Sequence, residues 1–161
     1  MRSAEDYKGT IKAYMYPPEW EACDGSVAPT GTAGLSIGQQ TRKTFGLAFR
    51  TRVGNDQDFE DHGYKLHLVY GATASPSERS YETINDSPDA MELSWEFETI
   101  PVSVPGYKPF AHMEIDSTKL KTEQEKTCLA NLEKILYGSD EATARLPLPS
   151  EIITIMTPAG G

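Results

Sequence analysis

The chain has 161 residues, a formal charge of −9 at pH 7, and 13 glycines and 11 prolines, which favour one β-rich, turn-rich domain over a helical bundle. The acidic balance argues against a protein that grips nucleic acid through its phosphates, because such binding needs clustered Lys and Arg. No apolar run approaches the roughly 18 residues of a membrane span. The N-terminus lacks the apolar core of a signal peptide, so we expect the chain to be made and kept in the cytoplasm.

The first predicted elements are a strand and a helical turn. Apolar residues alternate through residues 7–16, with Ile11, Ala13 and Met15 on one face. Two prolines end this strand, and residues 17–25 then favour a single helical turn that a proline opens.

A hairpin is predicted next. Residues 44–53 and 64–71 both alternate apolar with polar or small side chains, which is typical of half-buried strands. The acidic linker at 54–63 joins them, so we expect the two strands to pair with each other.

A long polar stretch at 72–90 separates this hairpin from the strongest predicted strand, at 91–104. An insertion of this length in a compact domain usually serves a partner or is disordered. Within the strand, the residues predicted to face the core are Met91, Leu93, Trp95 and Phe97. Those predicted to face the opposite side are Glu92, Ser94, Glu96 and Glu98.

The C-terminal part predicts a strand at 111–117, a helix at about 122–137 and a last strand at 151–156. Thr122 and Glu125 have the spacing of a capping box at the start of the helix. The apolar stripe of this helix consists of Leu129, Leu132, Ile135 and Leu136. We therefore predict a mainly β fold: an antiparallel β-sandwich or barrel-like sheet with one flanking α-helix, in a single domain over 1–161.

The sequence offers weak candidates for metal or nucleophilic chemistry. The three histidines lack a metal-ligand spacing such as HExxH, and we interpret them as surface or paired side chains: His62, His67 and His112. The acidic linker lacks the glycine position and the closing glutamate of a helix–loop–helix calcium site, and we interpret it as a solvated loop: Asp56, Asp58, Glu60 and Asp61. No serine lies in GxSxG. Cys23 and Cys128 form neither a disulfide framework nor a CxxC pair, so we expect reduced thiols.

The glutamates of the 91–104 strand are more informative. Together with Glu114 and Asp116, on a strand expected to be its neighbour, they would make one sheet face acidic. Basic residues expected to relieve this charge are Arg50, Arg52, Lys65 and His67. One interpretation is an ordinary water-facing sheet with cross-strand ion pairs. The other is a surface that repels a polyanion.

Several segments, taken together and in order, resemble the major tail protein, or tail tube protein, of long-tailed bacteriophages and prophages. They are SAEDYKGTIKAYMYPPEW, IGQQTRKTFGLAFRT, GYKLHLVYGATASPSERSYETINDSPDAMELSWEF, the PGYKP turn and LEKILYGSDEATARLPLPSEI. The resemblance covers roughly residues 3 to 153. Members of this family usually carry a further N-terminal segment before the first of these stretches, and we expect it to be missing here.

The resemblance implies a virion structural protein with neither catalytic activity nor a cofactor. Six copies would close into a ring, and rings would stack into a tube through which DNA passes into the host without specific binding. The implied partners are other copies of the chain and the tape measure, tail terminator and distal tail proteins, in the phage tail and, during assembly, in the host cytoplasm. No membrane partner is implied.

Two sets of residues gain a role in such a tube. Candidates to line the lumen and repel DNA are Glu92, Glu96, Glu98, Glu114 and Asp116. Candidates for a loop that reaches another subunit are Ser75, Pro76, Glu78, Tyr81, Asn85 and Asp86. The alternative from another class is a free-standing β-sandwich binding module, such as a capsid decoration or host-adhesion domain. An enzyme is less well supported, because the carboxylates are spread along a strand instead of converging in a pocket.

Overall fold

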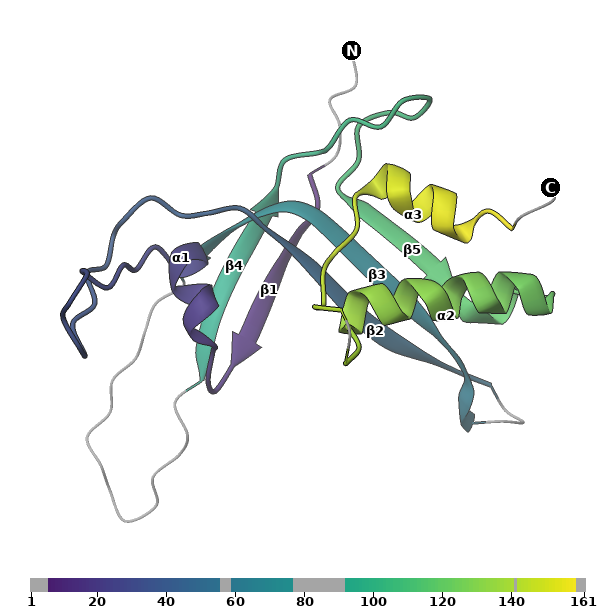
Figure 1. Ribbon diagram of the computed structural model, residues 1–161, viewed down its shortest axis with the longest axis horizontal. Coiled ribbons are helices and arrows are strands. Elements are labelled where there is room, and N and C mark those ends of the chain that lie inside the picture. Colours follow the sequence, from purple (N-terminus) through teal and green to yellow (C-terminus); the bar gives the residue numbers. More distant parts are fainter. Residues whose placement is uncertain (1–5, 56–58, 77–91, 141, 159–161) are drawn as a thin grey trace. The chain divides into compact units, whose positions relative to one another are not determined.

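The computed structural model describes residues 6–55, 59–76, 92–140 and 142–158 (Figure 1). Its strands are β1 (Lys8–Ala13), β2 (Phe45–Asn55), β3 (Phe59–Pro76), β4 (Leu93–Thr99) and β5 (His112–Asp116). Its helices are α1 (Glu21–Asp24), α2 (Glu123–Tyr137) and α3 (Pro149–Met156), with short 3₁₀ turns η1 (Pro18–Trp20) and η2 (Ser117–Lys119). The predicted mainly β fold with a flanking helix is confirmed.

The strands form one five-stranded sheet in the order β1-β4-β3-β2, and β5 also pairs with β3. The contacts divide the chain into two compact units. The first contains Met1–Phe45 and Tyr70–Pro101, and the second contains Gly46–Val69 and Val102–Gly161. The long strand β3 contributes its first part to the second unit and its last part to the first.

The core of the first unit follows from the alternation of β4. Leu93, Trp95 and Phe97 are buried, whereas Glu96 and Glu98 are exposed, so the predicted faces of this strand are confirmed for the described residues. Met91 lies outside the described residues. A strand turns successive side chains to opposite faces, and the sequence period therefore sets which face is buried.

Aromatic rings fill this core around Trp95. Its indole ring meets Tyr16 and Trp20 edge to face, at centroid distances of 5.6 and 5.5 Å. The indole Nε1 donates a hydrogen bond of 2.6 Å to Oδ1 of the buried Asp24, at the end of α1. A buried indole N–H needs a partner, so this bond ties the predicted helical turn to the sheet.

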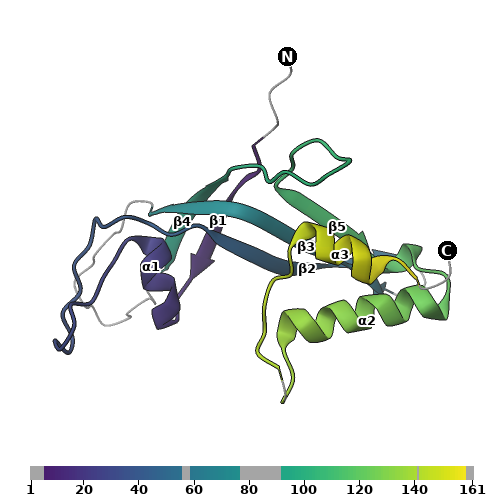
Figure 2. The same ribbon diagram turned by 45° about the horizontal axis from the view of Figure 1, so that its top comes forward.

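In the second unit, β3 and β5 share a buried face. The register pairs Leu66 with Ile115 and Leu68 with Met113, which turns these four side chains to the same side. Leu66 and Leu68 are fully buried. Helices α2 and α3 lie side by side in both views (Figure 1, Figure 2).

Arg50 of β2 joins the sheet of this unit to α2. Its Nη2 lies 3.2 Å from a carboxylate oxygen of Glu133, and its Nε donates to the hydroxyl of Tyr137. The guanidinium also lies over the ring of Tyr64, 4.5 Å from the centroid. Burial, and then the hydrogen bond that Tyr64 donates to Glu133, raise the pKa of this tyrosine to about 12. Arg50 therefore pairs with side chains of α2 and does not neutralise the acidic residues of β5, Glu114 and Asp116.

The predicted helix at about 122–137 is confirmed as α2, with the expected capping box. The Thr122 side chain accepts from the Glu125 N–H, and the Glu125 carboxylate accepts from the Thr122 N–H. Leu129 and Leu132 of the apolar stripe are buried.

Two expectations need correction. Residues 151–156, predicted as a last strand, belong to helix α3, which has Pro149 in its first turn. The strand predicted at 64–71 continues through 72–76 as part of β3, because these residues pair with β4. The polar insertion therefore begins later than the sequence suggested.

We expect Leu132→Ala to lower the free energy of unfolding by roughly 2–5 kcal/mol, because the fully buried side chain leaves a cavity. Urea unfolding followed by circular dichroism measures this change. Lys134→Ala, at an exposed position of the same helix, is the control and should change stability by no more than about 0.5 kcal/mol. Equal stability of the Leu132 variant and the parent would contradict the core position of this stripe.

Candidate assembly surfaces

Strand β1 forms an outer edge of the sheet. Its partner is β4, and the strand order ends at β1 among the described residues. The residues that follow it, Tyr14 and Met15, are 66% and 84% exposed. An open strand edge beside exposed apolar side chains is a template for pairing with another chain.

The exposed face of β1 and β4 carries alternating charges. We call it the β1–β4 polar face, and its residues are Lys8, Thr10, Lys12, Glu92, Ser94, Glu96 and Glu98. Lys8 Nζ lies 2.6 Å from Glu98, and Lys12 Nζ lies 2.7 Å from Glu92. The hydrogen bonds that these lysines donate to the glutamates raise the pKa of both ammonium groups.

This pairing changes the interpretation of the acidic face. Two lysines oppose three glutamates, which leaves one net negative charge, and Glu96 has no ion-pair partner in the described part of the chain. Both pairs are exposed and contribute little to stability. The β1–β4 polar face is thus nearly neutral, with a single excess carboxylate.

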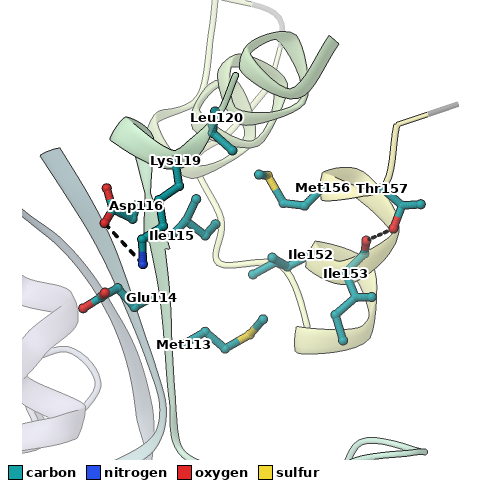
Figure 3. Close-up of a pocket in the computed structure, with 10 residues that line it drawn as sticks. All are labelled: Met113, Glu114, Ile115, Asp116, Lys119, Leu120, Ile152, Ile153, Met156 and Thr157. Carbon is teal, nitrogen blue, oxygen red and sulfur yellow. Dashed lines mark hydrogen bonds and ion pairs between the residues drawn. The ribbon is translucent and has the colours of Figure 1, made fainter. Parts of the chain in front are cut away.

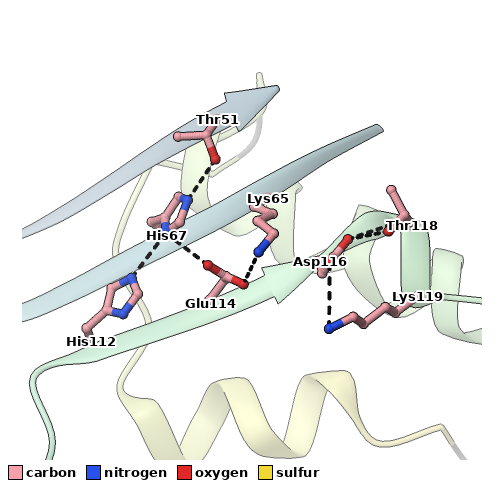
Figure 4. Close-up of polar contacts among 8 residues, drawn as sticks. All are labelled: Thr51, Lys65, His67, His112, Glu114, Asp116, Thr118 and Lys119. Carbon is pink, nitrogen blue, oxygen red and sulfur yellow. Dashed lines mark hydrogen bonds and ion pairs between the residues drawn. The ribbon is translucent and has the colours of Figure 1, made fainter. Parts of the chain in front are cut away.

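Glu114 and Asp116 lie on β5 in the second unit. Since β5 pairs with β3 and not with β4, the expectation that these residues neighbour the glutamates of β4 is wrong. Glu114 forms an ion pair of 2.8 Å with Lys65, whereas Asp116 accepts from Thr118 and lies 3.8 Å from Lys119 (Figure 4).

His67 and His112 form a pair on the same side of β3 and β5 as Glu114 (Figure 4). Nδ1 of His67 lies 3.1 Å from Nε2 of His112 and 3.7 Å from Glu114, and Nε2 of His67 lies 2.8 Å from the Thr51 hydroxyl. Phe49 stacks on the other face of His67, with a centroid distance of 4.7 Å. The interpretation of these two histidines as paired side chains is confirmed.

The candidate inter-subunit loop falls into two parts. Ser75 and Pro76 lie in β3, opposite Glu96 and Trp95 of β4. The other four candidates lie outside the described residues: Glu78, Tyr81, Asn85 and Asp86.

The sequence analysis did not predict a groove that lies between β5 and α3. Its volume is about 430 Å³, and its apolar lining consists of Met113, Ile115, Leu120, Ile152, Ile153 and Met156. Figure 3 shows the side chains of Met113, Ile152 and Met156 pointing into it. Two sequence features could have revealed it: the proline that opens α3, and the i, i+4 spacing of Ile152 and Met156, which predicts a helical face.

Within the described ranges, no three His, Cys, Asp or Glu side chains are grouped so that they could hold a metal ion. Cys23 and Cys128 are free thiols, as expected. Asp56 and Asp58 of the acidic linker lie outside the described residues, whereas Glu60 and Asp61 belong to β3, so the interpretation of these two as part of a loop is wrong. No described helix is both long and apolar enough to span a membrane.

Comparison with models of protein families, with curated proteins and with solved structures found no match.

The histidine pair predicts a stability loss in mild acid. Burial and the neighbouring His67 lower the pKa of His112 below 6.5, so the folded state binds this proton less readily than the unfolded state. The stability from neutral His112 is present above the unfolded pKa and is lost as the pH falls toward the folded pKa. We expect the melting temperature to fall more steeply between about pH 7.5 and pH 5.5 in the parent than in His112→Gln. Equal slopes of melting temperature against pH in the parent and in His112→Gln would contradict this contribution of neutral His112 to stability.

Proposed function

We propose that the chain is a virion structural protein, the subunit of a phage tail tube built from stacked hexameric rings. The observation that carries the proposal is the open edge of β1, flanked by exposed Tyr14 and Met15. Proteins normally protect such an edge, and closure of a ring of sheets removes it by joining each edge to a neighbour. The order of sequence segments that resemble tail tube proteins supports the same function.

The β1–β4 polar face suits the wall of a channel for DNA. It exposes hydroxyl groups and paired charges, with Glu96 as the excess carboxylate. A basic wall would bind phosphates and release counterions, whereas a weakly acidic wall would let the duplex slide. Six copies would line the channel with one excess negative charge each. In this proposal the tube acts in the virion, without catalysis, and its partners are copies of itself and other tail proteins.

We expect the purified chain to form rings or tubes as its concentration rises through the micromolar range. Negative-stain electron microscopy and analytical ultracentrifugation measure this directly. Met15→Lys places a charge beside the open edge at an exposed position, so it should reduce assembly without changing the melting temperature. A parent chain that stays monomeric at every concentration would contradict the tube and favour a free-standing binding module.

Reversing the charge of the β1–β4 polar face should convert a DNA-repelling wall into a DNA-binding one. The triple variant Glu92→Lys, Glu96→Lys and Glu98→Lys gives five lysines and no carboxylate on this face. We expect its tubes to bind double-stranded DNA at low salt, with an affinity that falls as salt rises. Phage carrying it should assemble tails but eject DNA poorly.

The matched control for this experiment is the triple Glu→Gln variant, which removes the same carboxylates without adding positive charge. Its tubes should bind DNA more weakly, and with a smaller salt dependence, than those of the lysine variant, because this face then carries two lysines per subunit instead of five. Normal ejection by the lysine variant at low salt would contradict a channel position for this face and would leave the tube itself unaffected.

A further inference from the structure

The two histidine rings of the second unit face each other through one nitrogen each. Nδ1 of His67 lies 3.1 Å from Nε2 of His112, whereas the ring centroids are 5.3 Å apart and the ring planes differ by 18°. Because the centroids are much farther apart than these nitrogens, both nitrogens lie in the gap between the rings (Figure 4). A ring nitrogen either donates or accepts, so the contact is a hydrogen bond only when the gap holds one proton.

Glu114 and Thr51 favour one direction of this hydrogen bond. A carboxylate oxygen of Glu114 lies 3.7 Å from Nδ1 of His67, and its negative charge favours a proton on that nitrogen. The Thr51 hydroxyl lies 2.8 Å from the other nitrogen of His67, Nε2, to which it can donate. Neutral His67 therefore donates from Nδ1, and Nε2 of His112 accepts.

A first added proton leaves this contact intact, and a second one breaks it. With one imidazolium and one neutral ring, the gap still holds one proton, and the hydrogen bond becomes charge-assisted. With two imidazolium rings, two N–H groups and two positive charges would meet at 3.1 Å. Burial and the neighbouring His67 lower the pKa of His112, so the doubly charged pair forms only in acid.

The side chains around the pair come from β2, β3, β5 and the segment that precedes β5: Phe49, Thr51, Lys65, Glu114 and Tyr107. The charged side chains among these are Glu114 and Lys65, which pair with each other at 2.8 Å. Asp116, farther along β5, lies 3.8 Å from Lys119, and Arg50 of β2 is turned to α2. One carboxylate that already pairs with a lysine does not balance two imidazolium ions.

The strand that this repulsion displaces most easily is β5. It has five residues, and its ladder among the described strands is with Lys65–Val69 of β3. His67 is held more firmly, because β3 also pairs with β2 and because Phe49 stacks on the ring, whose side chain is 12% exposed. A short strand with one ladder opens at a lower free energy than a strand paired on both sides.

We propose that the His67–His112 pair is a pH-sensitive latch on β5. With no more than one positive charge the pair holds β5 on β3, and uptake of the second proton opens the β3–β5 ladder. Opening exposes the apolar side of β5, Met113 and Ile115, which lines the β5–α3 groove. The latch lies within the second unit of a single chain, so it does not depend on the proposed tube.

Hydrogen exchange tests the latch in the full chain, at a concentration at which ultracentrifugation shows a monomer. Exchange is followed by mass spectrometry at pH 7.5 and at about pH 5, a range in which histidines change charge, and is corrected for the intrinsic pH dependence of amides. We expect the protection of residues 112–116 to fall by about tenfold, because the open strand binds the proton more readily than the closed one. The protection of β4, in the first unit, should change much less.

Three variants identify the groups responsible. His112→Gln takes no proton but can still bond to His67, so β5 should keep its protection in acid. Glu114→Gln removes the carboxylate that favours protonated His112 in the closed strand, so the loss of protection in acid should become larger. His62→Gln is the matched control: it removes the third histidine, which is exposed on the same strand β3, and should behave like the parent.

Two results for the parent chain alone would overturn the latch, whether or not each variant folds. Protection of residues 112–116 that persists at about pH 5 would mean that the rings separate without the strand. Protection that falls equally in β4 and β5 would report unfolding of the whole chain. A loss in His112→Gln as large as in the parent would also overturn it.

Discussion

The burial of one face of β4 is the constraint on which the first unit depends. Trp95 lies at its centre, opposite Ile11 of β1, in contact with the rings of Tyr16 and Trp20. Its hydrogen bond to Asp24 attaches the short helix α1 to the sheet and so fixes where the connection to β2, residues 25–44, begins. Since side chains alternate along a strand, burying this face sends Glu96 and Glu98 to solvent. The buried core and the β1–β4 polar face therefore both follow from the two-residue alternation of side chains along β4.

The same rule divides the second unit into an apolar side and an ionisable side. Leu66, Leu68, Met113 and Ile115 face one way, and Ile115 and Met113 line the groove beside α3. Lys65, His67 and Glu114 face the other way and satisfy one another through hydrogen bonds and ion pairs. Arg50 reaches α2 through Glu133 and Tyr137, which fixes the helix on the strands. The groove lies between this apolar side of β5 and the eight-residue helix α3.

Ion pairing decides what the charged surfaces can do. A carboxylate beside a lysine has little field at a distance, because the opposite charge cancels it and salt screens the remainder. Glu92 and Glu98 are paired in this way, so Glu96 dominates the field of the β1–β4 polar face. In the proposed tube this gives a weakly repulsive wall in place of a strongly acidic one.

The sequence alone determined the elements whose local signals agree. The alternation in 93–99, the capping box at Thr122 and Glu125, and the helical turn before Gly25 each predict one structure, and the structure has it. It could not decide which strand β5 pairs with, because strand pairing joins residues far apart in the sequence. It also could not decide whether residues 151–156 form a strand or a helix, because isoleucine favours strands unless packing selects a helix. It also allowed cross-strand ion pairs on the face that carries Glu92 and Glu98, but it expected the basic side chains there to be Arg50, Arg52, Lys65 and His67. Only the register of β1 against β4 places Lys8 and Lys12 beside these two glutamates, since cross-strand contacts depend on pairing and not on sequence distance.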